Sequence, residues 1–221
     1  MKILLLGGTG QVGFELQRSL SSLGEITSPN RDILDLLNYE AVESFLNKNE
    51  INLIVNAAAW TNVDDAENSR TEAKRLNAEL PKQLSFFCKK KKIRLVHYST
   101  DYVFNGSGTK PWTEISCPNP INFYGKTKLL GEEYIRNSSI DFLIFRISWI
   151  YSIRRSNFMK TILKLAKKQS ELKIVSDQYG SPTPAKIVAD ITFLALQRNL
   201  DAGVYHLAPR GETTWYDFSK T

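Results

Sequence analysis

Short apolar runs alternate with longer amphipathic segments along this chain of 221 residues. The runs have the length of buried strands, and the longer segments repeat their apolar residues at helical spacing. The runs around Ile54 and Val96 are continuously apolar, as in strands that helices cover on both faces. The pattern therefore predicts an α/β fold with a doubly wound parallel sheet. The expected strands are Lys2–Leu6, Glu25–Thr27, Leu53–Asn56, Arg94–Tyr98, Phe142–Arg146 and Lys173–Val175, and the expected helices are Gln11–Leu23, Tyr39–Asn49, Thr71–Lys91, Phe123–Asn137, Asn157–Lys168 and Ile187–Gln197.

Composition and charge narrow the class of protein. With 42% hydrophobic residues the chain can bury a substantial core. Its two cysteines, Cys88 and Cys117, fit no disulfide or zinc pattern, so we expect a reducing, cytoplasmic setting. The apolar start of the chain stops at Gly7, too early to span a membrane. The net charge is +6, but the densest basic run, Lys89–Lys92, suits the end of a helix and contains no aromatic residues, so we expect no nucleic-acid partner.

A glycine-rich turn links the first expected strand to the first expected helix, with the spacing Gly7-x-x-Gly10-x-x-Gly13. Glycine permits unusual backbone angles, a close approach of a pyrophosphate to the main chain, and tight packing of helix on strand. The N–H groups at the helix start then face the phosphates. We therefore expect residues 1–146 to form a dinucleotide-binding Rossmann domain. Residues 147–221, where the pattern loosens, are expected to form a smaller, incomplete substrate lobe interleaved with it.

The choice of cofactor is normally read at the end of the second strand, about 20 residues past the glycine turn. Here the chain has Arg31, Asp32 and Asp35. Arg31 is suited to bind a 2′-phosphate, whereas either aspartate is suited to a ribose or adenine edge, and the segment also reads as a solvated turn. The sequence favours NADPH, with NADH as the alternative.

A candidate for proton transfer lies in the fourth expected helix. Tyr124 and Lys128 are four residues apart, which places the phenol and the ammonium on one helix face. A phenol with a pKa near ~10 needs a nearby cation to ionise readily, and Lys128 is placed to supply it. Thr100 follows the strand Arg94–Tyr98, at the sheet end where open α/β folds bind ligands. We expect Thr100 to hydrogen-bond a substrate carbonyl oxygen that Tyr124 protonates.

These motifs, in this chain order, resemble those of the extended short-chain dehydrogenase/reductases. Within that superfamily the chain is most similar to the dTDP-4-dehydrorhamnose reductase family, and the similarity extends over essentially its whole length. The segments that carry it are Gly7–Gly13, Asn56–Thr61, His97–Phe104, Pro120–Lys128 with Gly131 and Glu132, Arg146–Trp149 and Asp177–Thr183.

The resemblance implies a role for each matching residue. It places Gly10, Gln11 and Val12 at the pyrophosphate, and Asp35 and Leu36 beside the adenine. Further contacts to the cofactor are expected for Ala59, Trp60, Thr61, Tyr98, Tyr124 and Lys128, and contacts to the sugar for Thr100, Asp101 and Trp149. The implied reaction is hydride transfer to C4 of dTDP-4-dehydro-L-rhamnose, a nucleotide-sugar step of cell-surface polysaccharide synthesis, with Tyr124 as proton donor and Lys128 as its partner. Trp149 and Asp101 also admit plain structural interpretations, as a core residue and a turn cap.

The chain departs from the family pattern at several points. Relatives have a glycine-containing turn where this chain has Ser152–Ser156, so that loop is expected to close differently over the substrate. Some members bind a metal at a dimer contact through glutamates, but Lys186 faces Glu15 here, so we expect no metal, while a homodimer remains an open expectation. Relatives also continue past Thr221 to complete the substrate lobe, which lowers the activity expected of these residues alone.

Besides reduction, the sequence leaves two functions open, an epimerase and a non-catalytic binding protein, and it disfavours a dehydratase. Sugar-nucleotide dehydratases of the superfamily have Asp-Glu after the active-site Thr, but Tyr102 follows Asp101 here, so dehydration is disfavoured. An epimerase, which would retain its oxidised cofactor, is one alternative. The other is a non-catalytic binding protein on the same fold, as in the regulatory subunit of methionine adenosyltransferase, but the presence of Thr100, Tyr124 and Lys128 favours catalysis.

Overall fold

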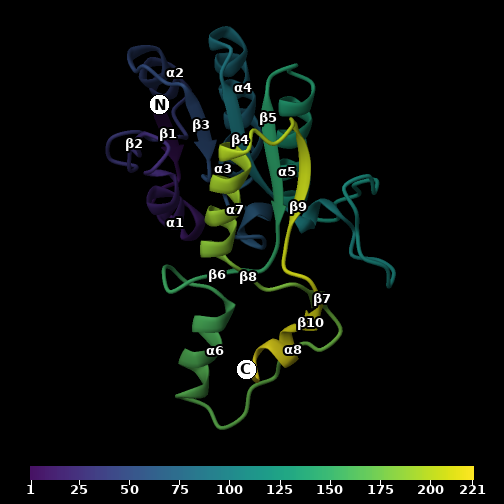
Figure 1. Ribbon diagram of the computed structural model, residues 1–221. Coiled ribbons are helices and arrows are strands. Elements are labelled where there is room, and N and C mark those ends of the chain that lie inside the picture. Colours follow the sequence, from purple (N-terminus) through teal and green to yellow (C-terminus); the bar gives the residue numbers. More distant parts are fainter.

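Six parallel strands form the main sheet of the computed structural model, which describes residues 1–221 (Figure 1). Their spatial order is β2-β1-β3-β4-β5-β9. This confirms the predicted α/β fold. Successive strands are added first on one side of β1 and then on the other, and this change of side opens a crevice at the carboxyl ends of β1 and β3. The strands are β1 (Lys2–Leu6), β2 (Glu25–Thr27), β3 (Leu53–Asn56), β4 (Arg94–Thr100), β5 (Phe142–Ile147) and β9 (Gly203–Leu207).

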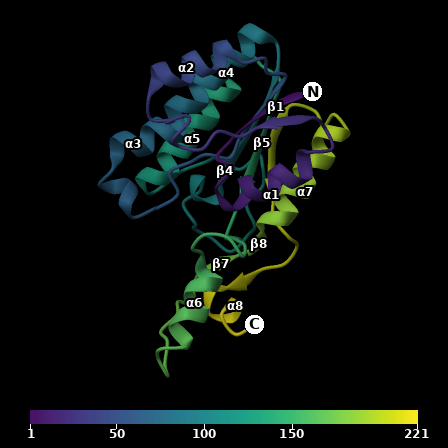
Figure 2. The same ribbon diagram turned by 90° about the vertical axis from the view of Figure 1, so that its left-hand side faces the viewer.

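Helices cover both faces of this sheet (Figure 2). One face carries α1 (Gln11–Leu20) and α7 (Ala185–Gln197), and the other carries α2 (Tyr39–Lys48), α4 (Leu80–Lys91) and α5 (Phe123–Arg136). Successive side chains of a strand point to opposite faces. Ile3 and Leu5 therefore pack in the core with α1 and α7, and Leu4 and Leu6 pack in the core with α2 and α4. Because both faces are buried, the strands are apolar without alternation.

A smaller lobe lies below the carboxyl ends of the main strands (Figure 1). It contains α6 (Phe158–Ala166), α8 (Trp215–Phe218) and two short sheets, in which β6 (Ile150–Tyr151) pairs with β8 (Thr183–Pro184) and β7 (Tyr179–Gly180) pairs with β10 (Thr213–Thr214). Between these pieces the chain returns to the main sheet through α7 and β9. The lobe is thus assembled from separate stretches of residues 147–221, and part of that range completes the Rossmann sheet.

Two expected elements differ in the structure. The expected strand Lys173–Val175 was wrong, because this segment is irregular and half of the Val175 side chain is exposed. The sixth strand of the sheet is instead β9, which the sequence pattern did not reveal. The expected helix Thr71–Lys91 is interrupted: α3 (Arg70–Lys74) and α4 flank a π-helical turn, η2 (Arg75–Glu79). Pro81 lies just after this turn and lacks the N–H that a regular helix needs there.

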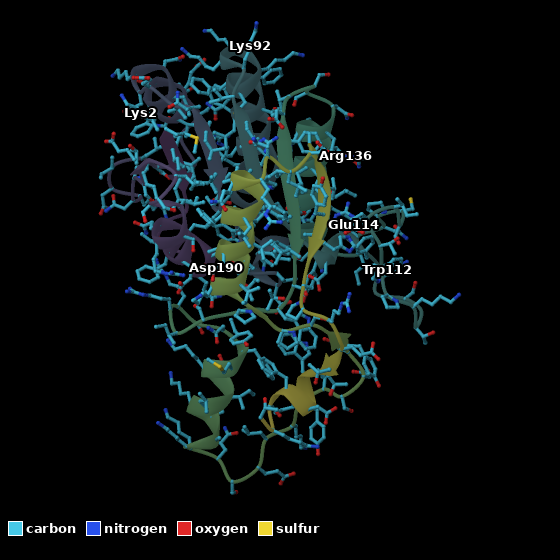
Figure 3. The ribbon with its side chains drawn as sticks, in the orientation of Figure 1. Lys2, Lys92, Trp112, Glu114, Arg136 and Asp190 are labelled. Carbon is cyan, nitrogen blue, oxygen red and sulfur yellow. The ribbon has the colours of Figure 1, made fainter.

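Short 3₁₀ turns join several of these elements. They are η1 (Asp65–Glu67), which follows β3, and η3 (Asp101–Val103), which follows β4. The segment beyond η3 projects beside β9, with Trp112 and Glu114 pointing back toward the sheet (Figure 3). Trp112 stacks on Phe104 with ring centroids 4.7 Å apart, and the Glu114 carboxylate accepts a hydrogen bond from the backbone N–H of His206. No helix of the chain is long and apolar enough to cross a lipid bilayer.

Candidate active site

A cavity of about 990 Å³ lies between the carboxyl ends of the main strands and the smaller lobe. Five strand-end segments line it, after β1, β2, β3, β4 and β5. Parallel strands bring their carboxyl ends to one edge of the sheet, so motifs far apart in sequence meet here. The candidate residues at the cavity wall are Gly7, Gly10, Gln11, Val12, Arg31, Asp35, Leu36, Ala59, Trp60, Thr61, Tyr98, Thr100, Asp101, Tyr124, Lys128 and Trp149.

The glycine turn forms one end of this cavity. Gly7 has a φ of +80°, in the left-handed region that favours glycine, and its carbonyl accepts the Gly10 N–H at 2.9 Å. A side chain on Gly13 would collide with the Gly7 carbonyl, so Gly13 serves the packing of α1 on the turn and is absent from the cavity wall. Gly10 caps α1 without any side chain. The first N–H groups of α1 are thereby left available to an anion.

The loop of residues 152–157 folds back onto the glycine turn. The Nε of Arg155 donates to the Thr9 carbonyl oxygen at 3.0 Å, and the Arg154 guanidinium lies 3.7 Å from the ring centroid of Phe14. The Oε1 of Gln11 accepts from Asn157 Nδ2 at 2.9 Å and from the Ser152 hydroxyl at 3.0 Å. The first turn of α1 has no acidic residue to balance these arginines. Two cations at the positive end of a helix dipole make this region strongly attractive to an anion.

In the segment after β2, which also lines the cavity, Arg31 and Asp35 form a loose ion pair, with Nε and Oδ1 3.8 Å apart. The Arg31 side chain is 78% exposed, so little holds it against a ligand phosphate. Asp35 Oδ1 also accepts the backbone N–H of Leu37, which fixes the carboxylate at the cavity wall. Asp32, the other acid considered from the sequence, does not line the cavity.

The segment after β3 is held by hydrogen bonds with the side chain of Asn77, which lies in η2. Its Oδ1 accepts the Trp60 N–H at 2.9 Å, and its Nδ2 donates to the Trp60 carbonyl and to the Thr127 hydroxyl, each at 3.1 Å. The π turn thus aims a buried amide at the cavity wall. Two buried polar atoms of the wall have no hydrogen-bond partner, Trp60 Nε1 and Ser99 Oγ. Unpaired buried polar groups are costly, so their presence here favours a polar ligand.

Thr100, Asp101 and Tyr124 meet at the centre of the cavity. Thr100 is the last residue of β4, and its hydroxyl donates to Asp101 Oδ1 at 3.1 Å while accepting the Tyr102 N–H. Burial raises the pKa of Asp101 to about 6, with the Thr100 hydrogen bond acting in the opposite direction. Burial also raises the pKa of Tyr124 well above its ordinary value, opposed by its hydrogen bond with Thr100. The Tyr124 phenol therefore keeps its proton at neutral pH, as a proton donor must.

Lys128 lies on the same face of α5 as Tyr124, but its amine does not hydrogen-bond the phenol. Nζ donates to the Tyr98 carbonyl oxygen at 2.6 Å and lies 3.4 Å from Nε2 of His97. Burial lowers the pKa of Lys128 to about 8, against an opposing effect of Glu132. The expected lowering of the Tyr124 pKa by Lys128 is therefore absent in this arrangement, because the Lys128 side chain is directed along β4.

Trp149 faces the cavity from the side of the smaller lobe. It has a φ of +48°, which is rare for a bulky residue, and its ring stacks on Trp215 with centroids 3.4 Å apart. A side chain at Gly180 would collide with the Trp149 ring. Trp149 is thus both packed within the lobe and present at the cavity wall, held rigidly by its neighbours.

The sequence profile of the RmlD substrate binding domain matches residues 1–221. The chain belongs to this family.

Individual RmlD-family relatives are similar over almost the whole chain. The dTDP-4-dehydrorhamnose reductase of Salmonella typhimurium is 43% identical over 227 residues, which cover 99% of this chain and 76% of the relative. Among solved structures, the dTDP-4-dehydrorhamnose reductase of Clostridium acetobutylicum has a TM-score of 0.95 at 37% identity and covers 100% of this chain and 78% of its own. The reductase of Bacillus anthracis, solved in complex with NADP, has a TM-score of 0.93 at 32% identity, covering 99% and 79%.

Ser99, Arg155 and Asn157 are among the polar cavity residues for which the sequence indicated no role. Ser99 precedes Thr100 at the end of β4, and its position in that strand was the available signal. Arg155 and Asn157 lie in the loop of residues 152–157. This loop contacts a glycine turn that is 146 residues away in sequence, and no local sequence pattern indicates such a contact. No group of three or more His, Cys, Asp or Glu side chains is arranged to hold a metal ion. At the α1–α7 contact, Lys186 pairs with Asp190.

Proposed function

We propose that this chain reduces the C4 keto group of dTDP-4-dehydro-L-rhamnose to give dTDP-L-rhamnose, with NADPH as the hydride donor. The observation that carries the proposal is the meeting of the glycine turn, Thr100 and Tyr124 in one cavity, in a chain that belongs to the RmlD family. The similar proteins of Salmonella typhimurium and Clostridium acetobutylicum bear the name of this activity.

The residues at the nucleotide end fit a dinucleotide. The glycine turn at the cavity wall, the start of α1 without a side-chain cap and the neighbouring Arg155 are suited to its pyrophosphate. Arg31 is suited to a 2′-phosphate, which favours NADPH over NADH and agrees with the NADP of the Bacillus anthracis relative. When bound, the nicotinamide supplies the hydride. Asp35, Leu36 and the segment Ala59–Thr61 are the proposed contacts along the remaining length.

Proton transfer falls to Tyr124. Hydride addition to a ketone creates an alkoxide, whose oxygen must be protonated. The Tyr124 phenol keeps its proton at neutral pH because burial raises its pKa. Thr100 hydrogen-bonds the phenol, and Lys128, one helical turn along α5, is proposed as the cation that offsets the charge on the phenolate, although its amine is bound to the Tyr98 carbonyl in this arrangement.

Recognition of the sugar is assigned to Asp101 and Trp149. With a pKa of about 6, the carboxyl of Asp101 is largely ionised at neutral pH and can accept hydrogen bonds from sugar hydroxyls. The rigid Trp149 indole offers an apolar face to the sugar ring. The proposed substrate site thus combines Asp101 of the Rossmann domain with Trp149 from residues 147–221, while most of the proposed cofactor contacts lie within residues 1–146. The free thiols Cys88 and Cys117 agree with a reducing, cytoplasmic setting. The expected homodimer stays a prediction.

The test is an NADPH oxidation assay with dTDP-4-dehydro-L-rhamnose, run beside UDP- and GDP-linked keto sugars. We expect oxidation that depends on the dTDP sugar and is much slower with the other two nucleotides. Cofactor binding without oxidation of NADPH by any of these sugars would favour a non-catalytic binding protein. NAD⁺ that remains bound through purification would favour an epimerase.

A further inference from the structure

A chain of buried polar groups stands behind Lys128 and has no part in the reaction as described so far. Asn56, at the end of β3, places its Nδ2 3.2 Å from Nδ1 of His97 on the neighbouring strand β4. The other ring nitrogen of His97, Nε2, lies 3.4 Å from Nζ of Lys128. Asn56, His97 and Lys128 are each no more than 2% exposed. Because these side chains are almost fully buried, their donors and acceptors must match those of their neighbours.

The orientation of Asn56 sets the direction of this chain. Its Oδ1 accepts the backbone N–H of Ala58 at 3.2 Å, so Nδ2, which can only donate, faces His97. His97 Nδ1 must then accept, and the ring proton of the neutral imidazole resides on Nε2. Burial, together with the nearby Lys128, lowers the pKa of His97 well below its ordinary value, which agrees with a neutral ring. The Nε2–H of His97 therefore points at the amine of Lys128.

Only one charge state of Lys128 satisfies all these contacts. An ammonium has three donors and no acceptor, so it would face the His97 N–H donor to donor. A neutral amine accepts from His97 with its lone pair and still donates to the Tyr98 carbonyl oxygen at 2.6 Å. Hydrogen bonds then run in one direction from Asn56 through His97 and Lys128 to Tyr98, an arrangement in which each bond strengthens the next.

We propose that Asn56 and His97 are positioning residues that favour the neutral amine of Lys128 until a bound anionic cofactor provides a partner for its charge. The pair thus couples the protonation of Lys128 to occupancy of the cavity. For catalysis the proposal rests on the proposed function, because Lys128 is there the cation that supports proton donation by Tyr124.

The other charged groups around Lys128 do not oppose this arrangement. Glu132, one turn further along α5, raises the Lys128 pKa, but its carboxylate is bound by Arg146 from β5 at 2.7 and 3.0 Å. Tyr124 on the same helix and Tyr98 on β4 are neutral at physiological pH, since burial raises the pKa of both phenols. Burial lowers the Lys128 pKa from 10.5 to about 8, which enlarges the fraction of neutral amine near neutral pH, and a bound anion would reduce that fraction again.

The first test is long-range ¹H–¹⁵N NMR of the histidine rings in the cofactor-free protein. The chain has only two histidines, and His206→Asn removes the signals of the second. The expected spectrum shows His97 neutral, with the proton on Nε2 and none on Nδ1. A proton on Nδ1, or a doubly protonated ring near neutral pH, would overturn the proposal. This measurement needs no catalytic activity, so its outcome is independent of the proposed function.

The second test reverses the direction of these hydrogen bonds with Asn56→Asp, which keeps the shape of the side chain. The new carboxylate must accept from His97, which moves the ring proton to Nδ1 and turns Nε2 into an acceptor for a Lys128 ammonium. We expect the proton of His97 to change nitrogen and the Lys128 pKa, followed through its ¹³Cε signal, to rise by about 1–3 units. The ¹³Cε signal is assigned by its loss in Lys128→Met.

A matched control is Gln83→Glu, another buried amide-to-acid change. Gln83 contacts Arg75 and Tyr39 but neither His97 nor Lys128, so this variant should leave the His97 tautomer and the Lys128 pKa unchanged. If the protein is active, the pH profile of kcat should shift upward in Asn56→Asp and stay in place in Gln83→Glu. An unshifted Lys128 pKa in Asn56→Asp, or an ordinary Lys128 pKa in the wild type, would overturn the proposal.

Discussion

Replacing Arg155 by Ala should weaken NADPH and NADH by the same factor. The Nε of Arg155 holds the Thr9 carbonyl of the glycine turn at 3.0 Å, and the rest of the guanidinium is free to meet the pyrophosphate that both cofactors share. Hydrogen bonds to charged groups contribute about 1.5–3 kcal/mol, which corresponds to roughly ten- to a hundredfold in affinity. The assay is a fluorescence titration of each reduced cofactor. Because the contact is partly exposed, the loss should shrink as salt is added.

Arg31→Ala provides the matched comparison. Arg31 lines the cavity with only a loose Asp35 partner and is the residue proposed to bind the 2′-phosphate, so its loss should weaken NADPH about ten- to a hundredfold and leave NADH nearly unchanged. The two substitutions should therefore differ in their effect on cofactor selectivity. The ratio of the NADPH and NADH affinities should stay constant in Arg155→Ala and change in Arg31→Ala. Unchanged affinities in Arg155→Ala would refute the assignment of the 152–157 loop to the pyrophosphate.

Three further changes test the site and the core. Tyr124→Phe should lower kcat by about 10²–10⁴-fold with little change in the Kd of NADPH, because a phenyl ring keeps the packing but cannot donate a proton; normal turnover would rule out Tyr124 as the acid. Glu132→Gln should cost about 3–5 kcal/mol in urea unfolding, since it leaves Arg146 charged at 3% side-chain exposure, and a loss near zero would show that the pair is dispensable. Burial holds the Lys128 pKa at about 8, below its ordinary 10.5, so the unfolded chain binds more protons between these values. Wild-type stability should therefore rise relative to Lys128→Met as pH increases through that window, by up to about 3 kcal/mol, whereas parallel pH curves would contradict the shift.

The main sheet was largely predictable from the sequence because its strands are covered on both faces. Lys2–Leu6 and Leu53–Asn56 have continuous apolar runs that surface segments lack, and the structure has the same bounds. β9 was missed since it lies at the sheet edge, where only Leu207 is fully buried and the apolar signal is weak. Lys173–Val175 shows the opposite error, because its local alternation has no neighbouring strand with which to pair.

Many residues of the candidate site could be predicted because parallel strands bring their carboxyl ends to one edge of the sheet. Thr100 and the glycine turn share a cavity for this reason. The spacing of Tyr124 and Lys128 correctly placed both on one helix face, but not where the amine points, since that depends on the Tyr98 carbonyl and His97 of another element. Contacts such as Arg155 with Thr9 depend on how a loop folds back across the molecule, which periodicity does not reveal.

The central claim is that hydride passes from the cofactor to C4 of the sugar while Tyr124 protonates the oxygen. The most direct measurement uses NADPH deuterated at the transferable C4 position, with analysis of the product sugar by NMR and mass spectrometry. We expect one deuterium on C4 of dTDP-L-rhamnose and stoichiometric formation of NADP⁺. A product without deuterium, or with solvent hydrogen exchanged at C3 or C5 and no net oxidation of NADPH, would contradict the account and indicate epimerisation.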